Sequence, residues 1–154
     1  MMLALISAAY LCCQIELKGE PEMIISGGEY YSQVDQEDID LMARVVMSEA
    51  GGQSGECKEA VATVILNRVA SPNYPMTIKE VINAKNQFST ANNGAPTAEC
   101  YDAVYSALVW FGSDNQIVPK SCYYFRSGHY HKWALDYCKI DDLYFSVPKD
   151  AVLD

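Results

Sequence analysis

The hydrophobic positions between Asp38 and Ser48 follow the three-and-four spacing of a helix with one buried face. Four residues form this face: Ile39, Met42, Val46 and Ala50. The pattern predicts a helix that is half sunk into a core and ends at the pair Gly51-Gly52.

Glu49 lies in the last turn of this predicted helix, where the helix dipole prefers a cation. A partly buried carboxyl group at such a position is expected to have a raised pKa, as a general acid near neutral pH requires. Glu49 is therefore a candidate catalytic residue. The alternative is a solvated glutamate at a frayed helix end.

A second helix is predicted after the glycine pair. Ser54 is a residue type that caps helix N-termini, and acidic residues follow it, as the helix dipole favours. A wide hydrophobic stripe then runs from 60 to 66, and the helix is expected to end at 67–69. Residues 71–75 have the composition of a loop.

Two more helices are predicted further along, one short and one long. Thr77 and Glu80 have the spacing of a capping box, which begins the short helix. A polar stretch at 83–94 interrupts it, and 96–99 opens the long helix with a proline near the first turn. The hydrophobic face of the long helix consists of Ala103, Val104, Ala107, Leu108 and Phe111.

The period changes in the C-terminal third. Residues 122–126 and 143–147 are short runs rich in aromatic side chains, which are typical of strands. The segment 127–133 between them is expected to form a compact loop crowded with polar and aromatic groups. Helices first and strands last predict an α+β domain, with a helical lobe followed by a small C-terminal β-hairpin or sheet.

The composition narrows the function classes. The chain has 154 residues, half of them hydrophobic, which fits one globular domain with a substantial core. Its formal net charge is −9 and it contains no run of basic residues. Nucleic acid is therefore not expected as a partner, because binding the phosphate backbone requires clustered lysine and arginine.

The N-terminal segment 1–13 is apolar and uncharged but too short to span a bilayer. It has the length of a signal-peptide core without the positively charged leading segment, so we expect a signal core or a hydrophobic anchor. A buried first helix is the alternative. Residues 14–36 show neither helical nor strand period and are expected to link this leader to a folded domain at 37–148, followed by a tail at 149–154.

Four cysteines lie in the predicted domain: Cys57, Cys100, Cys122 and Cys138. Their even number, together with the apolar leader, predicts an oxidising compartment and two disulfides. Four cysteines allow three pairings, which the sequence does not distinguish; Cys57 with Cys100 and Cys122 with Cys138 is the pairing we favour. The alternative is a set of reduced, buried thiols.

Aromatic residues in the final third could supply the stacking surfaces of a saccharide-binding groove. Six of them are candidates: Tyr123, Tyr124, Tyr130, Trp133, Tyr137 and Tyr144. The same side chains would equally fill strand positions and a hydrophobic core.

Two other kinds of site are disfavoured. His129 and His131, with Cys122 and Cys138 nearby, could suggest a zinc site, but the Cys-x-x-Cys spacing that is usual in structural zinc sites is absent. We expect neither a metal nor another cofactor. Cys57 lies in the first turn of a predicted helix, as in some thiol peptidases, but the charges of Glu56 and Glu59 would raise its pKa.

Five motifs follow one another along the predicted domain: residues 43–52, residues 60–69, Gln87-Phe88-Ser89, Tyr124-Phe125-Arg126 and Tyr144-Phe145-Ser146. Together, and in this order, they resemble the SleB/CwlJ cell wall hydrolases. The resemblance covers about residues 38–147, nearly the whole predicted domain. The resemblance implies a lysozyme-like α+β fold, activity on peptidoglycan that includes spore cortex, and Glu49 as the catalytic glutamate.

The resemblance also implies roles for other residues. Those expected near the cleft as substrate-binding residues are Gln87, Ser89, Tyr124, Arg126, His129 and Trp133. Those expected as structural supports are Asn67, Arg68 and Phe88. Where many relatives carry a second acid after the glycine, this chain has Gln53.

The number of carboxylates separates two mechanisms. A glycosidase of the usual type needs two, and the candidate partners of Glu49 are Glu56, Glu59 and Asp102, none of which the sequence singles out. A lytic transglycosylase needs one acid, which protonates the glycosidic oxygen and then, as a base, helps the muramyl 6-hydroxyl close onto C1. Gln53 favours this single-acid mechanism.

The sequence therefore predicts a peptidoglycan-degrading enzyme that cleaves the MurNAc–GlcNAc bond, as a lytic transglycosylase with Glu49 as both acid and base. Its expected partners are peptidoglycan glycan strands, with membrane contact only through the leader if this is retained. The expected location is outside the cell, in the cell wall or in the spore envelope. A non-catalytic peptidoglycan-binding module and a Cys57-dependent cell-wall peptidase are the alternatives.

Overall fold

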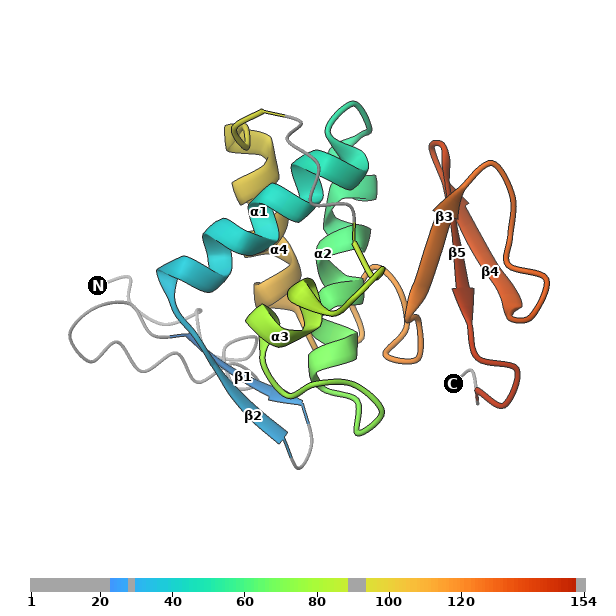
Figure 1. The fold of residues 1–154 in the computed structure, drawn as a ribbon, viewed down its shortest axis with the longest axis horizontal. Coiled ribbons are helices and arrows are strands. Elements are labelled where there is room, and N and C mark those ends of the chain that lie inside the picture. The colour runs from blue at the N-terminus through green and yellow to red at the C-terminus, as the bar shows by residue number, and fades with distance from the viewer. Residues whose placement is uncertain (1–22, 28–29, 89–93, 152–154) are drawn as a thin grey trace, which may run out of the picture.

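The three-stranded sheet lies beside a group of packed helices in the computed structural model of the chain (Figure 1). The structure describes residues 23–27, 30–88 and 94–151, with side chains from Val34 onward. The described helices are α1 (Gln36–Ala50), α2 (Gly55–Val69), α3 (Ile78–Asn83) and α4 (Ala98–Trp110). The described strands are β1 (Met23–Gly27), β2 (Tyr30–Val34), β3 (Tyr124–Ser127), β4 (Leu135–Ile140) and β5 (Leu143–Val147). The predicted α+β fold class is confirmed.

Helices α1, α2 and α3 begin where capping side chains satisfy free backbone N–H groups. The Asp35 carboxylate accepts from the Asp38 amide at 2.9 Å, so α1 starts two residues earlier than the hydrophobic spacing predicts. The Ser54 hydroxyl accepts from the Cys57 amide at 3.2 Å and starts α2, as predicted. The Thr77 hydroxyl accepts from the Glu80 amide at 3.2 Å and starts α3.

Helix α2 is the centre of the helical group. It packs against α1, α3 and α4, and nearly its whole length from Cys57 to Val69 is buried. Hydrophobic residues on all its sides explain why its sequence shows a wide stripe rather than a narrow face. The core continues into the sheet through Leu143, Phe145 and Val147 of β5.

The three-stranded sheet is antiparallel with the order β3-β5-β4, so β5 is its central strand. The two strands predicted from aromatic runs correspond to β3 and β5. Strand β4 was not predicted. It lies at the sheet edge with most of its side chains exposed, and a register shift between Asp136 and Cys138 breaks the alternation that identifies a strand in a sequence.

The N-terminal segment contains two strands that its sequence pattern does not predict. Within residues 14–36, predicted as a linker, β1 and β2 pair as an antiparallel hairpin, with Met23 opposite Val34. Val34 is fully buried in the hydrophobic core. The leader at 1–13 lies outside the described residues. In the described part of the chain, no helix combines the length and apolar character needed to cross a membrane.

The predicted disulfides are absent. All four cysteines of the described domain are free: Cys57, Cys100, Cys122 and Cys138. Cys57 and Cys100, expected as a pair, direct their sulfur atoms at different groups, the Ile140 carbonyl at 3.5 Å and the Met47 sulfur at 3.8 Å. Three of the four thiols are fully buried, so they fill the core as small hydrophobic side chains.

The side chain of Asn67 attaches the segment before β3 to α2. This asparagine is 2% exposed, and its amide nitrogen donates to the carbonyls of Pro119 at 2.9 Å and Cys122 at 3.0 Å. Its oxygen accepts from Gln116 at 3.0 Å. One buried side chain thus satisfies three polar groups of a segment that has no regular structure.

Asn67→Ala is expected to lower the free energy of unfolding by about 2–4 kcal/mol, because it leaves buried carbonyl groups without a donor. Asn83→Ala is the matched control. The Asn83 side chain is exposed and donates only to the Lys79 carbonyl of its own helix, so a change within about 0.5 kcal/mol is expected. Urea denaturation measures the free energy of unfolding of both variants. Equal losses in the two variants would contradict the role assigned to Asn67.

Candidate active site

A pocket of about 300 Å³ lies where the ends of α1 and α2 face the three-stranded sheet. The described residues that line it are Glu49, Arg68, Gln87, Phe125, Arg126, Ser127 and Leu143. Among them Glu49 is the one aspartate or glutamate, and Arg68 and Arg126 are cations. The pocket therefore combines a single carboxylate with two guanidinium groups.

The end of α1 fixes the position of Glu49, which is half-buried. The backbone amide of Gly51 donates to the Met47 carbonyl at 3.1 Å and closes the last turn. A Cβ atom on Gly51 would lie 2.5 Å from this same carbonyl oxygen, so only glycine fits here without a shift of the helix end. Gly51 is thus required by the packing of the turn that carries the Glu49 carboxylate.

Arg68 contributes a buried cation to the pocket. The residue is 6% exposed, and its Nε and Nη2 atoms donate to the Tyr123 carbonyl at 2.9 and 2.7 Å. Its guanidinium carbon lies 4.7 Å from the centre of the Phe88 ring. Burial lowers the pKa of Arg68, while the nearby Tyr74 and Tyr124, with Glu49 among the weaker contributors, act to raise it. Arg68 is therefore within electrostatic reach of Glu49.

Gln87 is oriented by Arg68. Its Oε1 atom accepts from Nη1 of Arg68 at 3.1 Å. A guanidinium group has only donors, so the atom facing it must be the amide oxygen, and the amide nitrogen is directed elsewhere. The residue before it, Asn86, has a φ of 61°, a left-handed conformation that asparagine tolerates better than most residues. Ser89, predicted to bind substrate, lies outside the described residues.

The predicted substrate-binding residues separate into two groups. Gln87 and Arg126 line the pocket with Glu49, whereas Tyr124, His129 and Trp133 are not among its lining residues. Tyr124 and Trp133 instead form an aromatic contact, with ring centres 4.7 Å apart. Trp133 is 56% exposed. Ser127 and Leu143 also line the pocket and were not predicted, because neither carries a distinctive chemical signal in the sequence.

The aromatic residues expected to form one groove are likewise divided. Tyr130 packs edge-on against Tyr144, with ring centres 4.9 Å apart. Tyr123 contacts Tyr74 of the α2–α3 loop and also Tyr124, with ring centres 5.4 and 6.2 Å apart, so Tyr123, Tyr124 and Trp133 form a separate group. These contacts stabilise the packing of the sheet and its loops.

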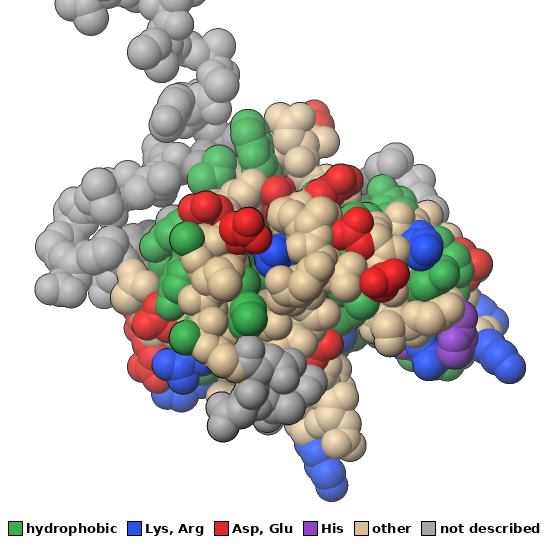
Figure 2. All heavy atoms as spheres, turned by 90° about the horizontal axis from the view of Figure 1, so that it is seen from above, with side chains coloured by type: hydrophobic (Ala, Val, Ile, Leu, Met, Phe, Trp, Pro, Cys, Tyr) green, Lys and Arg blue, Asp and Glu red, His purple; other side chains and the backbone are tan. Residues whose placement is uncertain are grey.

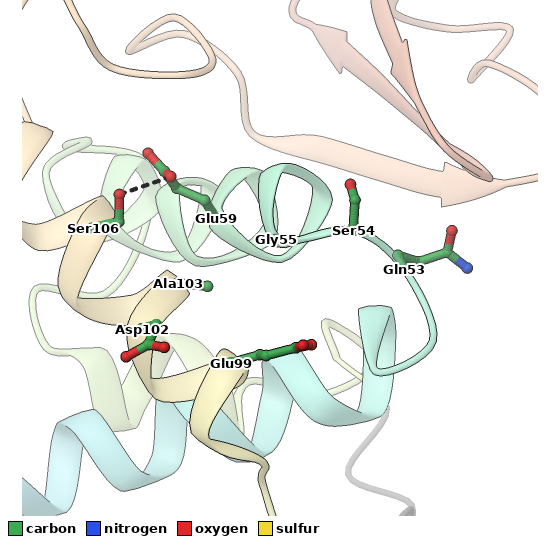
Figure 3. Close-up of a pocket in the computed structure, with 8 residues that line it drawn as sticks. All are labelled: Gln53, Ser54, Gly55, Glu59, Glu99, Asp102, Ala103 and Ser106. Atoms are coloured by element: carbon green, nitrogen blue, oxygen red, sulfur yellow. Dashed lines mark hydrogen bonds between the residues drawn. The ribbon is translucent and has the colours of Figure 1, made fainter.

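A second pocket of about 500 Å³ lies between the start of α2 and α4 (Figure 3). Glu59 from α2 and Asp102 from α4, two candidate partners of Glu49, line this pocket and not the first one. The Glu59 carboxylate accepts from Ser106 at 2.8 Å, and Glu99 forms an ion pair at 3.0 Å with the buried Lys58. The third candidate, Glu56, is absent from the lining of both pockets.

Gln53, which stands where many relatives have an acid, also borders the second pocket. Its side-chain nitrogen donates to the Asp142 carboxylate at 3.3 Å, and its oxygen accepts from the Asp142 amide at 3.3 Å. The neighbouring Ser54 amide donates to Asp141 at 2.7 Å. These bonds connect the α1–α2 loop to the turn between β4 and β5.

The environment of Cys57 does not suit a nucleophile. Burial, followed by the charges of Asp141 and Asp142, raises the pKa of this thiol to about 12. At neutral pH it is therefore almost entirely in the unreactive thiol form. In the described part of the chain, no group of three or more His, Cys, Asp and Glu side chains could hold a metal ion.

Known proteins similar to this chain were found by sequence. Residues 52–146 match a family model described as Cell Wall Hydrolase. The chain is 37% identical over 113 residues to the spore cortex-lytic enzyme of Oceanobacillus iheyensis, a match that covers 70% of this chain and 37% of that protein. It is 38% identical over 77 residues to the spore cortex-lytic enzyme of Bacillus cereus, covering 47% of this chain and 30% of that protein. The chain thus spans about a third of the length of these relatives.

Solved structures with the same fold include two catalytic domains. That of the Bacillus cereus SleB protein has a TM-score of 0.64 and 27% sequence identity, covering 79% of this chain and 99% of that chain. That of the germination-specific lytic transglycosylase SleB from Bacillus anthracis has a TM-score of 0.61 and 28% identity, covering 73% and 96%. The lysozyme-like arrangement of helices and a small sheet is confirmed.

Alkylation of the native protein with iodoacetamide is expected to modify Cys138 first among the four cysteines of the domain. Cys138 is partly exposed, whereas Cys57, Cys100 and Cys122 are 0% exposed. Burial also raises the pKa of Cys57 and Cys122 to about 12, which keeps both as thiols. Peptide mass spectrometry measures each site, with urea-unfolded protein as the control in which all four react. Rapid native labelling of Cys57 would contradict the structure.

Proposed function

Because the chain belongs to the cell wall hydrolase family, we propose that it degrades peptidoglycan with the pocket around Glu49 as its active site. The family match agrees with the resemblance carried by the spaced sequence motifs. The pocket supports the assignment of the site because it holds a half-buried carboxylate on a rigid helix end, beside cations and amide groups. The proposed substrate is the glycan strand, cleaved between MurNAc and GlcNAc.

The observation that carries the proposed mechanism is the single acidic side chain among the described residues of this pocket. In a lytic transglycosylation, Glu49 donates its proton to the glycosidic oxygen as the bond from this oxygen to C1 of the muramyl residue breaks. The resulting carboxylate then takes the proton of the muramyl 6-hydroxyl while this oxygen bonds to C1. The products are a new GlcNAc 4-hydroxyl and a 1,6-anhydromuramyl end, and Glu49 is protonated again. A second carboxylate is not needed.

The arrangement of the residues that line the pocket supports roles for several residues near Glu49. Gln87 and Arg126 would contact the sugar units on either side of Glu49. Ser89, outside the described residues, is proposed as a further substrate-binding residue. Tyr124, His129 and Trp133 would contact substrate beyond the pocket. Asn67, Arg68 and Phe88 would hold the walls in place, and the cation of Arg68 would stabilise the carboxylate that Glu49 becomes after donating its proton.

The proposed place of action is outside the cell membrane, in the wall or the spore envelope, where the polymer is found. The Cys57-dependent peptidase is disfavoured by the raised pKa of this thiol. A peptidoglycan-binding module without turnover is the remaining alternative, and the following experiment separates it from an enzyme.

Glu49→Gln is expected to reduce product release by about 1,000-fold or more, because the amide can neither donate nor accept the transferred proton. Purified cortex and vegetative peptidoglycan are digested, and the released muropeptides are identified by mass spectrometry. The wild type should give 1,6-anhydromuramic ends.

The matched control for this experiment is Glu59→Gln, which makes the same chemical change in the second pocket and should retain nearly full activity. Reducing ends from the wild type would indicate hydrolysis instead of transglycosylation. No release from either substrate by the wild type would favour the binding module.

Gly51→Ala is expected to lower kcat about tenfold or more, because the added methyl group displaces the Met47 carbonyl and with it the turn that carries Glu49. Gly52→Ala is the control, since a Cβ atom at this position meets no atom within 4 Å. Thermal unfolding of both variants establishes how much protein is folded at the assay temperature. Equal activity of the two variants would show that this turn does not set the position of Glu49.

A further inference from the structure

One segment of this acidic protein has more basic than acidic residues. The segment 119–140 holds four of the 11 lysine and arginine residues and both histidines, with Asp136 as its one acidic residue, although the whole chain has a net charge of −9. Figure 2 shows histidine and basic side chains together at the end of the molecule where the sheet lies, and acidic side chains over the helices.

Four residues of the β3–β4 region form what we term the basic patch: Arg126, His129, His131 and Lys132. Arg126, His129 and Lys132 are exposed. Burial first, and then the charges of Arg126 and His129, lower the pKa of His131, which indicates that these three side chains lie near one another. Arg126 and Lys132 carry the permanent positive charge of the patch, which attracts anions.

The basic patch is continuous with the candidate active site. Arg126 lines the pocket that contains Glu49, and the chain then continues directly through His129 and Lys132 on the loop after β3. A ligand that fills the pocket and extends past Arg126 would therefore meet the other residues of the basic patch.

Aromatic contacts hold the patch on a fixed support. The ring of Trp133 lies 4.7 Å from the rings of both Tyr124 and His131. At the other side of the loop, Tyr130 packs against Tyr144 of β5 at 4.9 Å. The loop that carries the cations is thus packed against the sheet, and a charged ligand group would not need to order it on binding.

The chemistry of the proposed substrate identifies the anion. The sugar rings of a glycan strand are neutral, and its negative charges are the carboxylates of the peptide stems attached to the muramyl lactyl groups. We propose that the basic patch binds the carboxylates of a peptide stem next to the bond cleaved at Glu49. This inference rests on the proposed function and adds a preference for strands that carry charged stems.

The test compares two substrates that differ only in charge. Peptidoglycan is freed of teichoic acids and its amino groups are acetylated, so that stem carboxylates are the remaining anions. One half is then amidated with carbodiimide and methylamine. The wild type should show a kcat/KM about fivefold to tenfold higher on the charged form at low salt, and the preference should shrink as added salt screens the patch.

The double variant Arg126→Gln/Lys132→Gln should bring the ratio of the two kcat/KM values close to one. The matched control is Lys79→Gln/Lys149→Gln, which also removes two exposed positive charges but lies outside the patch and should keep the wild-type ratio. A wild-type ratio near one, or a ratio that the patch variant leaves unchanged, would overturn the proposal.

A binding measurement separates this proposal from the proposed catalytic function. Cosedimentation of Glu49→Gln protein with the two peptidoglycan forms reports stem recognition without turnover, and tighter binding to the charged form is expected. Equal product release from both forms would agree with the proposed catalytic function and would contradict the binding of stem carboxylates by the basic patch. Equal binding to the charged and amidated forms, with tighter binding to both when teichoic acids are retained, would assign the patch to phosphate groups and overturn the assignment to stem carboxylates.

Discussion

The arrangement of the candidate site depends on the attachment of the segment before β3 to the last turns of α2. Asn67 and Arg68 make this attachment. Asn67 donates hydrogen bonds to the backbone carbonyls of Pro119 and Cys122, and Arg68 donates to that of Tyr123. The carbonyls belong to a segment without regular structure, which has no ladder partners of its own. Buried side chains therefore replace the hydrogen bonds that a strand would supply, and the sheet is held at a fixed distance from the helix.

The same attachment brings a cation beside the carboxylate. Arg68 is nearly fully buried because it bonds Tyr123 and stacks on Phe88, and burial of a guanidinium is tolerated only when its donors are used. A residue expected to support the helix pair thus also lines the pocket of Glu49. In this protein, structural support and the electrostatics of the site come from one side chain, so a substitution of Arg68 changes both.

Local patterns in the sequence were sufficient to predict the helix at the end of which Glu49 lies and the start of the next helix. They were not sufficient to predict the contacts around Glu49. The spacing of Ile39, Met42 and Val46 identifies α1, and the capping serine identifies the start of α2. Strand β4 escaped prediction because its bulge at Tyr137 breaks the alternation. The disulfide prediction was wrong because an even number of cysteines does not reveal that three of them fill a core. The bonds of Arg68 end on backbone carbonyls, which every residue has and which therefore leave no signal in a sequence.

The separation of the carboxylates between two pockets bears most directly on the chemistry. Glu59 and Asp102 are candidate partners of Glu49 in the sequence, yet they face a pocket between α2 and α4, where Glu59 is bonded to Ser106. The described residues around Glu49 instead contribute guanidinium groups. Hydrolysis by the usual inverting mechanism would need a second carboxylate near the scissile bond, at a set distance from the first, to activate a water molecule. Because the described residues of this pocket supply two cations and no second carboxylate, the proposed nucleophile is the muramyl 6-hydroxyl of the substrate, with Glu49 taking its proton.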